Sequence, residues 1–302
     1  MINKIAFISI HWLGDSFWDA QLIPKLIELY PKSEIYFICK PPSKYLFSQY
    51  LPEKNILCYD SIISDRHREQ FSIGSFYKDI KSCRKLNFTE IIDLSNNRYS
   101  ALFSFLSGVK RTTGLKDHGF SFLYKKSFPG FDYSRHLSTK PWYILRQIHE
   151  NLEAGEIKYF PKLLSEQKEK IALLVPGAGW SAKQWPAKFF VEVGCKLQKQ
   201  GYDVWVSGSP KEEELVNEVQ QKIIGSYKFE GSLPELFQLI AKVRVSMAND
   251  SGPGHLLAAA GSRHAALFTD QTKPQKCSPL GQQAKIFHLH DVESVLEFLL
   301  EM

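Results

Sequence analysis

The sequence has no long apolar run, no paired-cysteine motif and no dinucleotide fingerprint, and each absence removes a class of protein. Nowhere do about 18 consecutive apolar residues occur, so no transmembrane helix is expected. The cysteines lie far apart and form no CxxC pair, which argues against a disulfide framework or a zinc site and predicts free thiols. They are Cys39, Cys58, Cys83, Cys195 and Cys277. Neither half contains GxGxxG or a Walker A motif, so neither NAD chemistry nor ATP hydrolysis is indicated.

The composition is that of a globular protein with two domains. Of 302 residues, 44% are hydrophobic and 23% are charged, and this length accommodates two domains of about 100 to 200 residues. The apolar start of the chain ends at His11 and Asp15 without a cleavage site, so it predicts a first strand and not a signal peptide. We therefore expect a cytoplasmic protein, with peripheral contact at the inner membrane as an additional possibility.

The net charge of +6 is a modest excess that suits anionic substrates or an anionic membrane face. No nucleic-acid-binding motif accompanies it, so no nucleic-acid partner is expected. Part of the charge is local, because residues 108–126 carry five basic residues against Asp117 alone, with aromatic residues between them. The basic residues are Lys110, Arg111, Lys116, Lys125 and Lys126. This segment is either a solvated loop or a contact for an acidic, lipid-linked acceptor.

Two parts of the chain begin alike, each with an apolar strand, a turn and an amphipathic helix. In the first half these are residues 5–10, 11–15 and about 17–30, and in the second half 171–175, 176–180 and 187–200. Short apolar runs that alternate with helices are typical of strands buried in a parallel sheet. Further strands are predicted at 34–39, 90–94, 203–207, 243–247 and 264–268, and further helices at 75–86, 97–106, 253–260 and 291–300.

The pattern predicts an α/β protein of two Rossmann-like, doubly wound domains that face each other across a cleft. We place an N-terminal domain at 1–158 and a C-terminal domain at 159–302, with the option that the last helix packs back on the first domain. Open parallel sheets bind ligands outside the carboxyl ends of their strands. The functional loops are therefore predicted at 11–16, 95–98, 176–184, 207–212, 248–255 and 269–274.

The strongest local signal is the segment from Asn249 to His255, which follows a strand and opens a helix. Ser251 or Gly252 can cap this helix, Pro253 suits its first turn, and the backbone N–H groups can bind a phosphate or pyrophosphate. His255 lies in the first turn and can donate to the same anion. The alternative is an ordinary helix cap with a histidine in the core.

Two weaker signals follow the first strand of each half. In residues 176–186 a glycine-rich turn, which includes Gly179, allows close approach to a ligand, and Lys183 supplies a charge suited to phosphate. Trp185 is better explained as a structural aromatic residue at a helix start. After the first strand, Asp15 is either the N-cap of a helix or a general base that takes a proton from an acceptor hydroxyl.

Together these segments resemble glycosyltransferase family 9, the ADP-heptose:lipopolysaccharide heptosyltransferase family. The resemblance rests on Gly14-Asp15 and on residues 176–186, 201–214 and 248–262. It implies a GT-B fold and an inverting, metal-independent transfer of a heptose or related sugar from a nucleoside-diphosphate donor, such as ADP-heptose. The acceptor implied is of the lipopolysaccharide or lipooligosaccharide type. The nucleotide sugar is then a substrate, and neither a cofactor nor a bound metal is expected.

The resemblance also implies roles for individual residues. Asp15 would be the catalytic base, Lys183 and Gly179 would contact the donor diphosphate, and the loop after 243–247 would hold the donor sugar and pyrophosphate. The residues of that loop are Asp250, Ser251, Gly252 and His255. One acid among Glu212, Glu213 and Glu214 would contact the nucleoside ribose, and Glu213 is taken as the candidate.

The chain departs from the family where Ala178 and Gly179 replace hydroxyl residues and where 269–274 replaces a Gly-Pro-Thr-Asp-Pro run. These departures affect the identity of the donor sugar more than the reaction class. Two alternatives remain open at this point. One is a sugar-nucleotide epimerase or hydrolase of the same fold, and the other is a catalytically silent binding protein.

Overall fold

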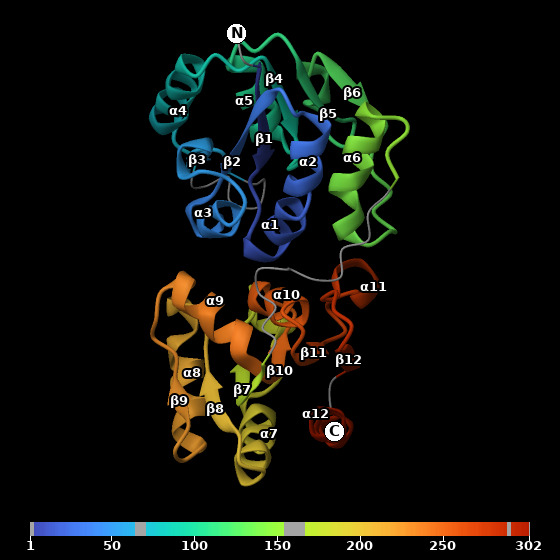
Figure 1. Cartoon of the computed structure of the whole chain (residues 1–302). Coiled ribbons are helices and arrows are strands. Elements are labelled where there is room, and N and C mark those ends of the chain that lie inside the picture. The colour runs from blue at the N-terminus through green and yellow to red at the C-terminus, as the bar shows by residue number, and fades with distance from the viewer. Residues whose placement is uncertain (1–2, 64–70, 154–166, 289–290, 302) are drawn as a thin grey trace. The chain divides into compact units, whose positions relative to one another are not determined.

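The structure is a computed structural model that describes residues 3–63, 71–153, 167–288 and 291–301. Contacts within the chain divide it into two compact units, Met1–Glu156 and Ile157–Met302. In Figure 1 the first unit runs from blue to green and the second from yellow-green to red. The predicted boundary between residues 158 and 159 lies outside the described residues, so it stays a prediction.

The first unit is built on a parallel six-stranded sheet. Its strands are β1 (Asn3–Ser9), β2 (Ser33–Cys39), β3 (Ile56–Cys58), β4 (Glu90–Asp93), β5 (Thr112–Leu115) and β6 (Lys126–Phe128). They are arranged in the order β3-β2-β1-β4-β5-β6, and each neighbouring pair is parallel. The last five residues of both β1 and β2 are buried, which explains why these strands are nearly continuous apolar runs in the sequence.

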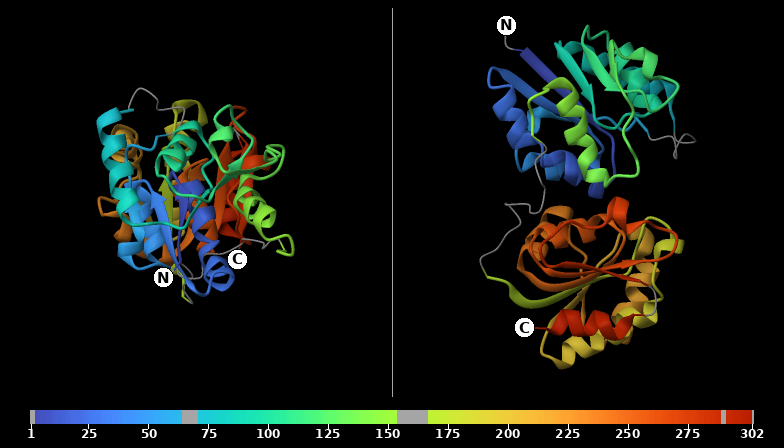
Figure 2. Two further views of the ribbon diagram at one scale, coloured as in Figure 1. Left: turned by 90° about the horizontal axis from the view of Figure 1, so that it is seen from above. Right: turned by 90° about the vertical axis from the view of Figure 1, so that its right-hand side faces the viewer.

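Helices cover both faces of this sheet (Figures 1 and 2). They are α1 (Leu13–Ala20), α2 (Ile23–Leu29), α3 (Pro41–Ser48), α4 (Ile73–Lys85), α5 (Arg98–Leu106) and α6 (Lys140–Ile148). On one face Phe76 of α4 and Phe103 of α5 belong to a buried cluster with Ile8 of β1. On the other face the ring of Phe37 stacks on Phe47 of α3, with ring centroids 4.6 Å apart. The sheet is therefore doubly wound, as predicted.

The helical stretch predicted for residues 17–30 is two helices and not one. Helix α1 begins earlier, at Leu13, and α2 begins at Ile23 with Pro24 in its first turn. Proline lacks the N–H that a continuous helix needs and suits a helix start, so the helix ends before it and a new one begins. The correction matters for the site because it places Asp15 inside the first turn of α1.

The second unit repeats the strand order of the first. Its strands are β7 (Glu169–Val175), β8 (Asp203–Val206), β9 (Tyr227–Lys228), β10 (Val243–Asn249), β11 (Arg263–Phe268) and β12 (Ala284–His288). The sheet order is β12-β11-β10-β7-β8-β9, again with every neighbouring pair parallel. When the strands of each unit are numbered from its own first strand, the two sheets have the same order, written here in opposite directions. This confirms that the two halves share one plan.

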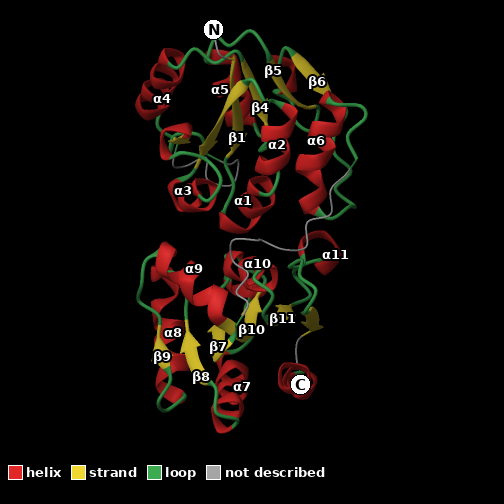
Figure 3. Ribbon diagram, in the orientation of Figure 1, coloured by secondary structure: helices red, strands yellow, loops and turns green. Residues whose placement is uncertain are grey.

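The helices of the second unit are shown in red in Figure 3. They are α7 (Ala187–Lys199), α8 (Glu213–Lys222), α9 (Leu233–Lys242), α10 (Gly252–Ala259), α11 (Pro274–Cys277) and α12 (Val292–Leu300). Helices α7 and α10 are followed by Gly201 and Gly261, whose φ angles are 78° and 77°. Because glycine adopts this left-handed conformation without steric cost, it ends both helices where the sequence predicted.

The final helix belongs to the second unit. Val295, Leu296 and Leu299 of α12 are buried in one cluster with Phe190 of α7 and Leu267 of β11. The option that this helix packs back on the first domain is therefore wrong, because its apolar face is already used in the core of its own unit. Among the described residues, no helix combines the length and the apolar character that a membrane span requires.

Candidate functional site

Two of the six predicted functional loops, 207–212 and 269–274, follow β8 and β11, and the other four follow the two strands of each unit at which the sheet order reverses. These strands are β1 and β4 in the first unit and β7 and β10 in the second. Connections leave such a pair toward opposite sides of the sheet, which opens a crevice at the carboxyl ends of the strands. The Asp15 segment follows β1, the Lys183 segment follows β7, and the segment from Asp250 to His255 follows β10.

Asn249, the last residue of β10, joins the loops after β7 and β10. Its side chain is buried, donates from Nδ2 to the carbonyl of Pro176 at 2.6 Å, and accepts at Oδ1 from the backbone N–H of Trp185 at 3.0 Å. Trp185 is also buried and donates from its indole to the carbonyl of Phe268 at 3.1 Å. The loop that carries Lys183 is thereby held at both ends. Trp185 is structural, as the sequence indicated.

Helix α10 begins at the carboxyl end of β10 with an N-terminus that no side chain caps. Ser251 occupies the N-cap position, makes no side-chain cap, and keeps its buried Oγ without a hydrogen-bond partner among the described residues. Pro253 lies in the first turn, while Ser251 and Gly252 remain partly exposed. The backbone N–H groups of this turn and the positive end of the helix dipole form a site suited to an anion.

Lys183 lies beside this helix start and pairs with Asp250. Its Nζ is 2.5 Å from Oδ2 of Asp250, and the two side chains are 16% and 6% exposed. The same Nζ lies 4.4 Å from the centre of the Trp180 ring. Two residues that the sequence assigned to donor binding are thus brought together from positions 67 apart. The pair carries no net charge. A diphosphate that binds here would therefore either share Lys183 with Asp250 or replace Asp250 as its partner.

Of the candidates Glu212, Glu213 and Glu214, it is Glu212 that lies against the loop after β7. A Cβ added to Gly177 would lie 2.2 Å from the carboxylate carbon of Glu212, so only glycine leaves room for this carboxylate. The carboxylate is held by the N–H and the hydroxyl of Ser209, each at 2.7 Å. Glu213 instead pairs with Lys228 at 3.1 Å. Gly179 has open space around its Cα, with no atom within 4 Å of a Cβ built there.

A buried histidine on the neighbouring strand β11 packs against helix α10. His264 on β11 is fully buried, and one ring nitrogen lies 2.9 Å from the Ser246 hydroxyl. Burial, assisted by His255, lowers the pKa of His264 to about 3, so this ring is neutral near pH 7. Ser262 joins the group, because its hydroxyl lies 2.7 Å from that of Ser246 and donates to the carbonyl of Leu257 in α10. The sequence analysis did not identify this group.

In the first unit Asp15 lies in the first turn of α1 and is partly buried. The interpretation of Asp15 as an N-cap is wrong, because the cap position belongs to Trp12, which makes no side-chain cap. A carboxylate in the first turn still interacts favourably with the helix dipole. Its position leaves the proposed role as a general base open.

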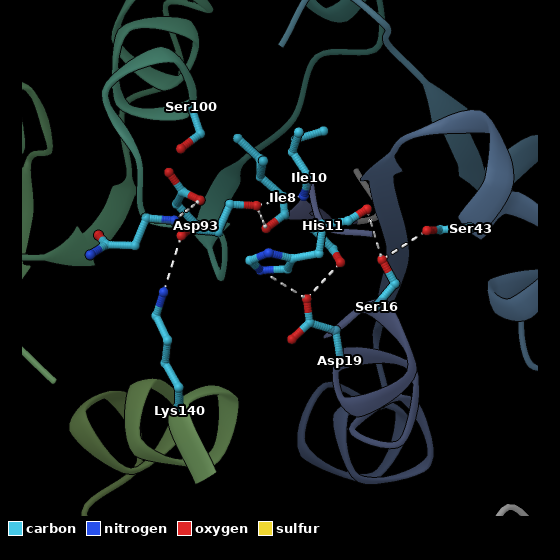
Figure 4. A network of polar contacts seen from close by, with 12 residues as sticks. Ile8, Ile10, His11, Ser16, Asp19, Ser43, Asp93, Ser100 and Lys140 are labelled. Carbon is cyan, nitrogen blue, oxygen red and sulfur yellow. Dashed lines mark hydrogen bonds and ion pairs between the residues drawn. The ribbon is translucent and has the colours of Figure 1, made fainter. Parts of the chain in front are cut away.

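A network of buried polar groups surrounds the carboxyl ends of β1 and β4 (Figure 4). Asp19, one helical turn after Asp15, is 1% exposed and accepts from the Ser9 hydroxyl at 2.5 Å. Its Oδ2 lies 3.6 Å from Nε2 of His11. Burial raises the pKa of Asp19 to about 7 and lowers the pKa of His11 to about 3. Near pH 7, His11 is therefore neutral, and the Asp19 carboxyl group is about half protonated.

Lys140, at the start of α6, contributes a positive charge to this network. Its Nζ donates to the carbonyl of Ser95 at 3.1 Å, and Figure 4 shows it approaching β4 from α6. Burial lowers the pKa of Lys140, while surrounding carboxylates oppose that shift. These carboxylates are Asp117, Asp93, Asp19 and Asp15. Asp15 is thus one of several acids within electrostatic reach of a single lysine.

The raised pKa of Asp19 predicts how its replacement changes stability with pH. A carboxyl group whose pKa is 3.8 when unfolded and about 7 when folded favours the folded state at low pH, and this contribution is lost as pH rises toward 7. Asp19→Asn removes the titrating carboxyl group, so the variant does not lose this stability as the pH rises. We expect the variant's free energy of unfolding, relative to that of the native chain, to rise by about 2 to 3 kcal/mol between about pH 5 and pH 8.

Urea unfolding of both proteins at the two pH values measures this difference. His264 lies in the other unit and contributes to both proteins alike, so its pH dependence cancels in the comparison. A constant difference between the two proteins would show that Asp19 does not titrate in the folded chain as argued.

Several residues of these two sites escaped the sequence analysis because they carry no local motif. They are His11, Asp19, Asp93 and Lys140 in the first unit, and Asn249 and His264, as structural supports, in the second. In the described part of the chain, no three or more His, Cys, Asp or Glu side chains are grouped so that they could hold a metal ion. None of the five cysteines forms a disulfide.

Comparison with known proteins identifies the family of the chain. The profile of glycosyltransferase family 9 (heptosyltransferase) matches residues 76–297. Lipopolysaccharide heptosyltransferase 2 of Escherichia coli strain K12 is 25% identical over 312 residues, an alignment that covers 95% of this chain and 88% of the relative.

Solved structures show the same fold. E. coli ADP-heptose LPS heptosyltransferase II superimposes with a TM-score of 0.78 at 22% identity. The superposition covers 98% of this chain and 97% of the solved chain. E. coli heptosyltransferase WaaC with ADP gives a TM-score of 0.80 at 15% identity and covers 98% of both chains. The two parallel sheets and these superpositions identify the fold as GT-B. The matched profile covers most of the sequence, and the chain therefore belongs to glycosyltransferase family 9 and is a glycosyltransferase.

Proposed function

We propose that this chain transfers a heptose or related sugar from a nucleoside-diphosphate donor, ADP-heptose in the simplest case, to a lipopolysaccharide-type acceptor. The observation that carries the donor half of the proposal is the close approach of Lys183, Asp250 and the uncapped start of α10. The named relatives support the choice of sugar and acceptor, since one is a lipopolysaccharide heptosyltransferase and another holds ADP.

The donor diphosphate is proposed to lie at the N-terminus of α10. When the bond between the sugar and the diphosphate breaks, negative charge grows on the leaving oxygen. The backbone N–H groups after Ser251 and the ammonium of Lys183 stabilise this charge, because fixed dipoles and charges act strongly where little water is present. His255, in the same first turn, contributes a ring beside the phosphates. This arrangement supplies the charge stabilisation that would otherwise come from a divalent ion, so we propose that the transfer is metal-independent and needs no cofactor.

Glu212 is the better candidate for contact with the nucleoside. It lies against Gly177 in the loop that leads to Lys183, and Ser209 fixes its carboxylate. A carboxylate can accept two hydrogen bonds from the vicinal hydroxyls of a ribose. Glu213 forms an ion pair with Lys228 and is exposed, which argues against Glu213 as the residue that contacts the nucleoside.

Asp15 is proposed as the general base on the acceptor side. The acceptor hydroxyl oxygen attacks the anomeric carbon on the face opposite the diphosphate, and its proton passes to the Asp15 carboxylate. One such displacement forms the new glycosidic bond, breaks the bond to the diphosphate and inverts the anomeric centre. Lys140 lies within electrostatic reach of Asp15 and places positive charge on the acceptor side.

The experiment that tests this function combines the purified chain with a panel of sugar nucleotides and a lipopolysaccharide acceptor that lacks heptose. Mass spectrometry of the acceptor is expected to show the added mass of one sugar with ADP-heptose, and proton NMR of the product is expected to show an inverted anomeric centre. An acceptor that stays unmodified with every donor would contradict the proposal.

Two controls separate this function from its alternatives. Donor and enzyme without acceptor are expected to give little hydrolysis or epimerisation, whereas a full rate in water would favour a hydrolase or epimerase. EDTA is expected to leave the transfer rate nearly unchanged, and a strict requirement for added magnesium would overturn the metal-independent scheme.

A further inference from the structure

The segment that connects β5 to β6 exposes two aromatic rings at the edge of the first sheet. Phe122 is 77% exposed and Phe120 is 39% exposed, and their rings stack with centroids 6.4 Å apart. Large apolar side chains gain free energy when they leave water, so two adjacent exposed rings indicate a surface that is covered in use. We call residues 116–126, with these two rings, the aromatic-basic segment.

The rings are exposed because the rest of the segment is anchored inward. Tyr124 is buried, donates to Asp93 at 2.6 Å, and packs on Gly114, where a Cβ would lie 2.4 Å from its ring. With Tyr124 held in the interior, Phe122 two residues earlier stays at the surface. The exposed rings therefore sit on a fixed support that presents them outward.

Positive charge surrounds the rings. Lys116, Lys125 and Lys126 are all exposed. The ammonium of Lys126 lies 4.6 Å from the centre of the Phe128 ring, a contact that leaves its charge in place. The one acid of the segment, Asp117, is occupied elsewhere. Its carboxylate accepts from the Asn96 amide, the Phe131 backbone N–H and the Tyr133 hydroxyl, each at 2.9 Å. The lysines therefore keep their charge available for an external partner.

From this geometry we propose that the aromatic-basic segment is a docking surface for an anionic phospholipid bilayer. Exposed phenylalanines insert at the level of the headgroups, and flanking lysines bind acidic lipids. The surface brings the enzyme to the layer that carries a lipid-anchored acceptor, and in that respect alone the inference rests on the proposed function. Binding to the bilayer itself requires no donor, no acceptor and no sugar transfer.

Vesicle sedimentation with the full chain tests the proposal. We expect binding to phosphatidylcholine vesicles that contain about 30 mol% phosphatidylglycerol, little binding to phosphatidylcholine alone, and weaker binding in about 0.5 M NaCl because salt screens the lysines. Phe120→Ser with Phe122→Ser is expected to weaken the partition coefficient by about tenfold or more. Lys116→Ser with Lys125→Ser is expected to remove the preference for anionic vesicles.

The matched control changes another exposed apolar pair in the same unit. Ile73 and Tyr77 of α4 are 78% and 56% exposed, and Ile73→Ser with Tyr77→Ser is expected to bind vesicles like the native chain. Thermal unfolding checks that all variants remain folded. The proposal is overturned if the phenylalanine variant binds like the native chain, if neutral vesicles bind equally well, or if only the control variant loses binding.

A separate readout distinguishes this inference from the proposed function. With a soluble acceptor fragment that lacks its lipid, the phenylalanine variant is expected to transfer sugar at the native rate. Loss of transfer to the soluble fragment would show that the two rings serve the reaction or the fold, and it would overturn the docking role.

Discussion

Asp15→Asn is expected to lower the turnover of sugar transfer by about 10²- to 10⁴-fold, the range for removal of a general base. Asparagine has nearly the size of aspartate but cannot take the proton of the acceptor hydroxyl. Because Asp15 follows β1 while the donor residues follow β7 and β10, the affinity for the donor is expected to change little. Turnover measured by nucleoside-diphosphate release, with calorimetry of donor binding, separates the two quantities.

The matched control is Asp203→Asn, which removes an exposed carboxylate at the start of β8 and is expected to keep native turnover. The pH dependence adds a second readout. A base must be ionised to act, so the native rate is expected to fall at acidic pH, whereas the residual rate of the variant is expected to lack that dependence. Native turnover in the variant would remove Asp15 from the mechanism.

The neighbours of Asp15 make this test more informative than a single substitution. Asp19 lies one turn away on the same helix and is buried, so its carboxylate is not open to a substrate that could reach Asp15. Lys140 holds positive charge near both acids. Because Asp15 is partly exposed and Asp19 is buried, only Asp15 is open to an acceptor hydroxyl.

The sequence predicted the doubly wound fold because the central strands are buried on both faces. Strands β1, β2, β7 and β10 are apolar runs, and glycine marks the ends of α7 and α10. The sequence analysis missed strands β3, β5, β6, β9 and β12. Strand β12 has a single buried residue, and the other four have only two to four residues each. A strand so short provides too few residues to show a period.

Site residues could be predicted where a motif follows a central strand. They could not be predicted where only tertiary contacts determine which residue belongs to the site. Asp15, Lys183 and Asp250 follow strands that the sequence identified. Lys140 enters the network from a segment after an unrecognised strand, so nothing local marks it. Glu212 and Glu213 are adjacent in the sequence, and only the packing of Glu212 against Gly177 distinguishes them.

Lys183→Ala is expected to weaken the binding of ADP by about 1.5 to 3 kcal/mol, the range for a hydrogen bond to a charged group. This corresponds to roughly a 10- to 150-fold rise in the dissociation constant. The substitution removes the ammonium that lies beside the start of α10. Calorimetry with ADP isolates the diphosphate from contacts made by the sugar. The control is Lys188→Ala, which removes an exposed lysine of the neighbouring helix and is expected to leave the affinity unchanged.

Part of the loss in Lys183→Ala comes from the partner that remains. Asp250 is only 6% exposed in its side chain, and without Lys183 its charge stands near the incoming phosphates with no counter-charge from that lysine. Such a carboxylate repels the ligand in addition to the lost attraction. Asp250→Asn removes the repulsion, so the double variant is expected to bind ADP more tightly than Lys183→Ala alone.

A double-mutant cycle over Lys183 and Asp250 therefore distinguishes two arrangements of the bound state. If Lys183 transfers from Asp250 to the diphosphate, Asp250→Asn alone strengthens ADP binding, because the lysine no longer has to leave a partner. If Lys183 instead stays paired with Asp250 when ADP binds, Asp250→Asn alone does not strengthen ADP binding. The double variant then binds ADP like the native chain, because Lys183→Ala acts only through the unpaired charge of Asp250. The second result would remove the lysine from the donor site and leave the N-terminus of α10 as its anion-binding element.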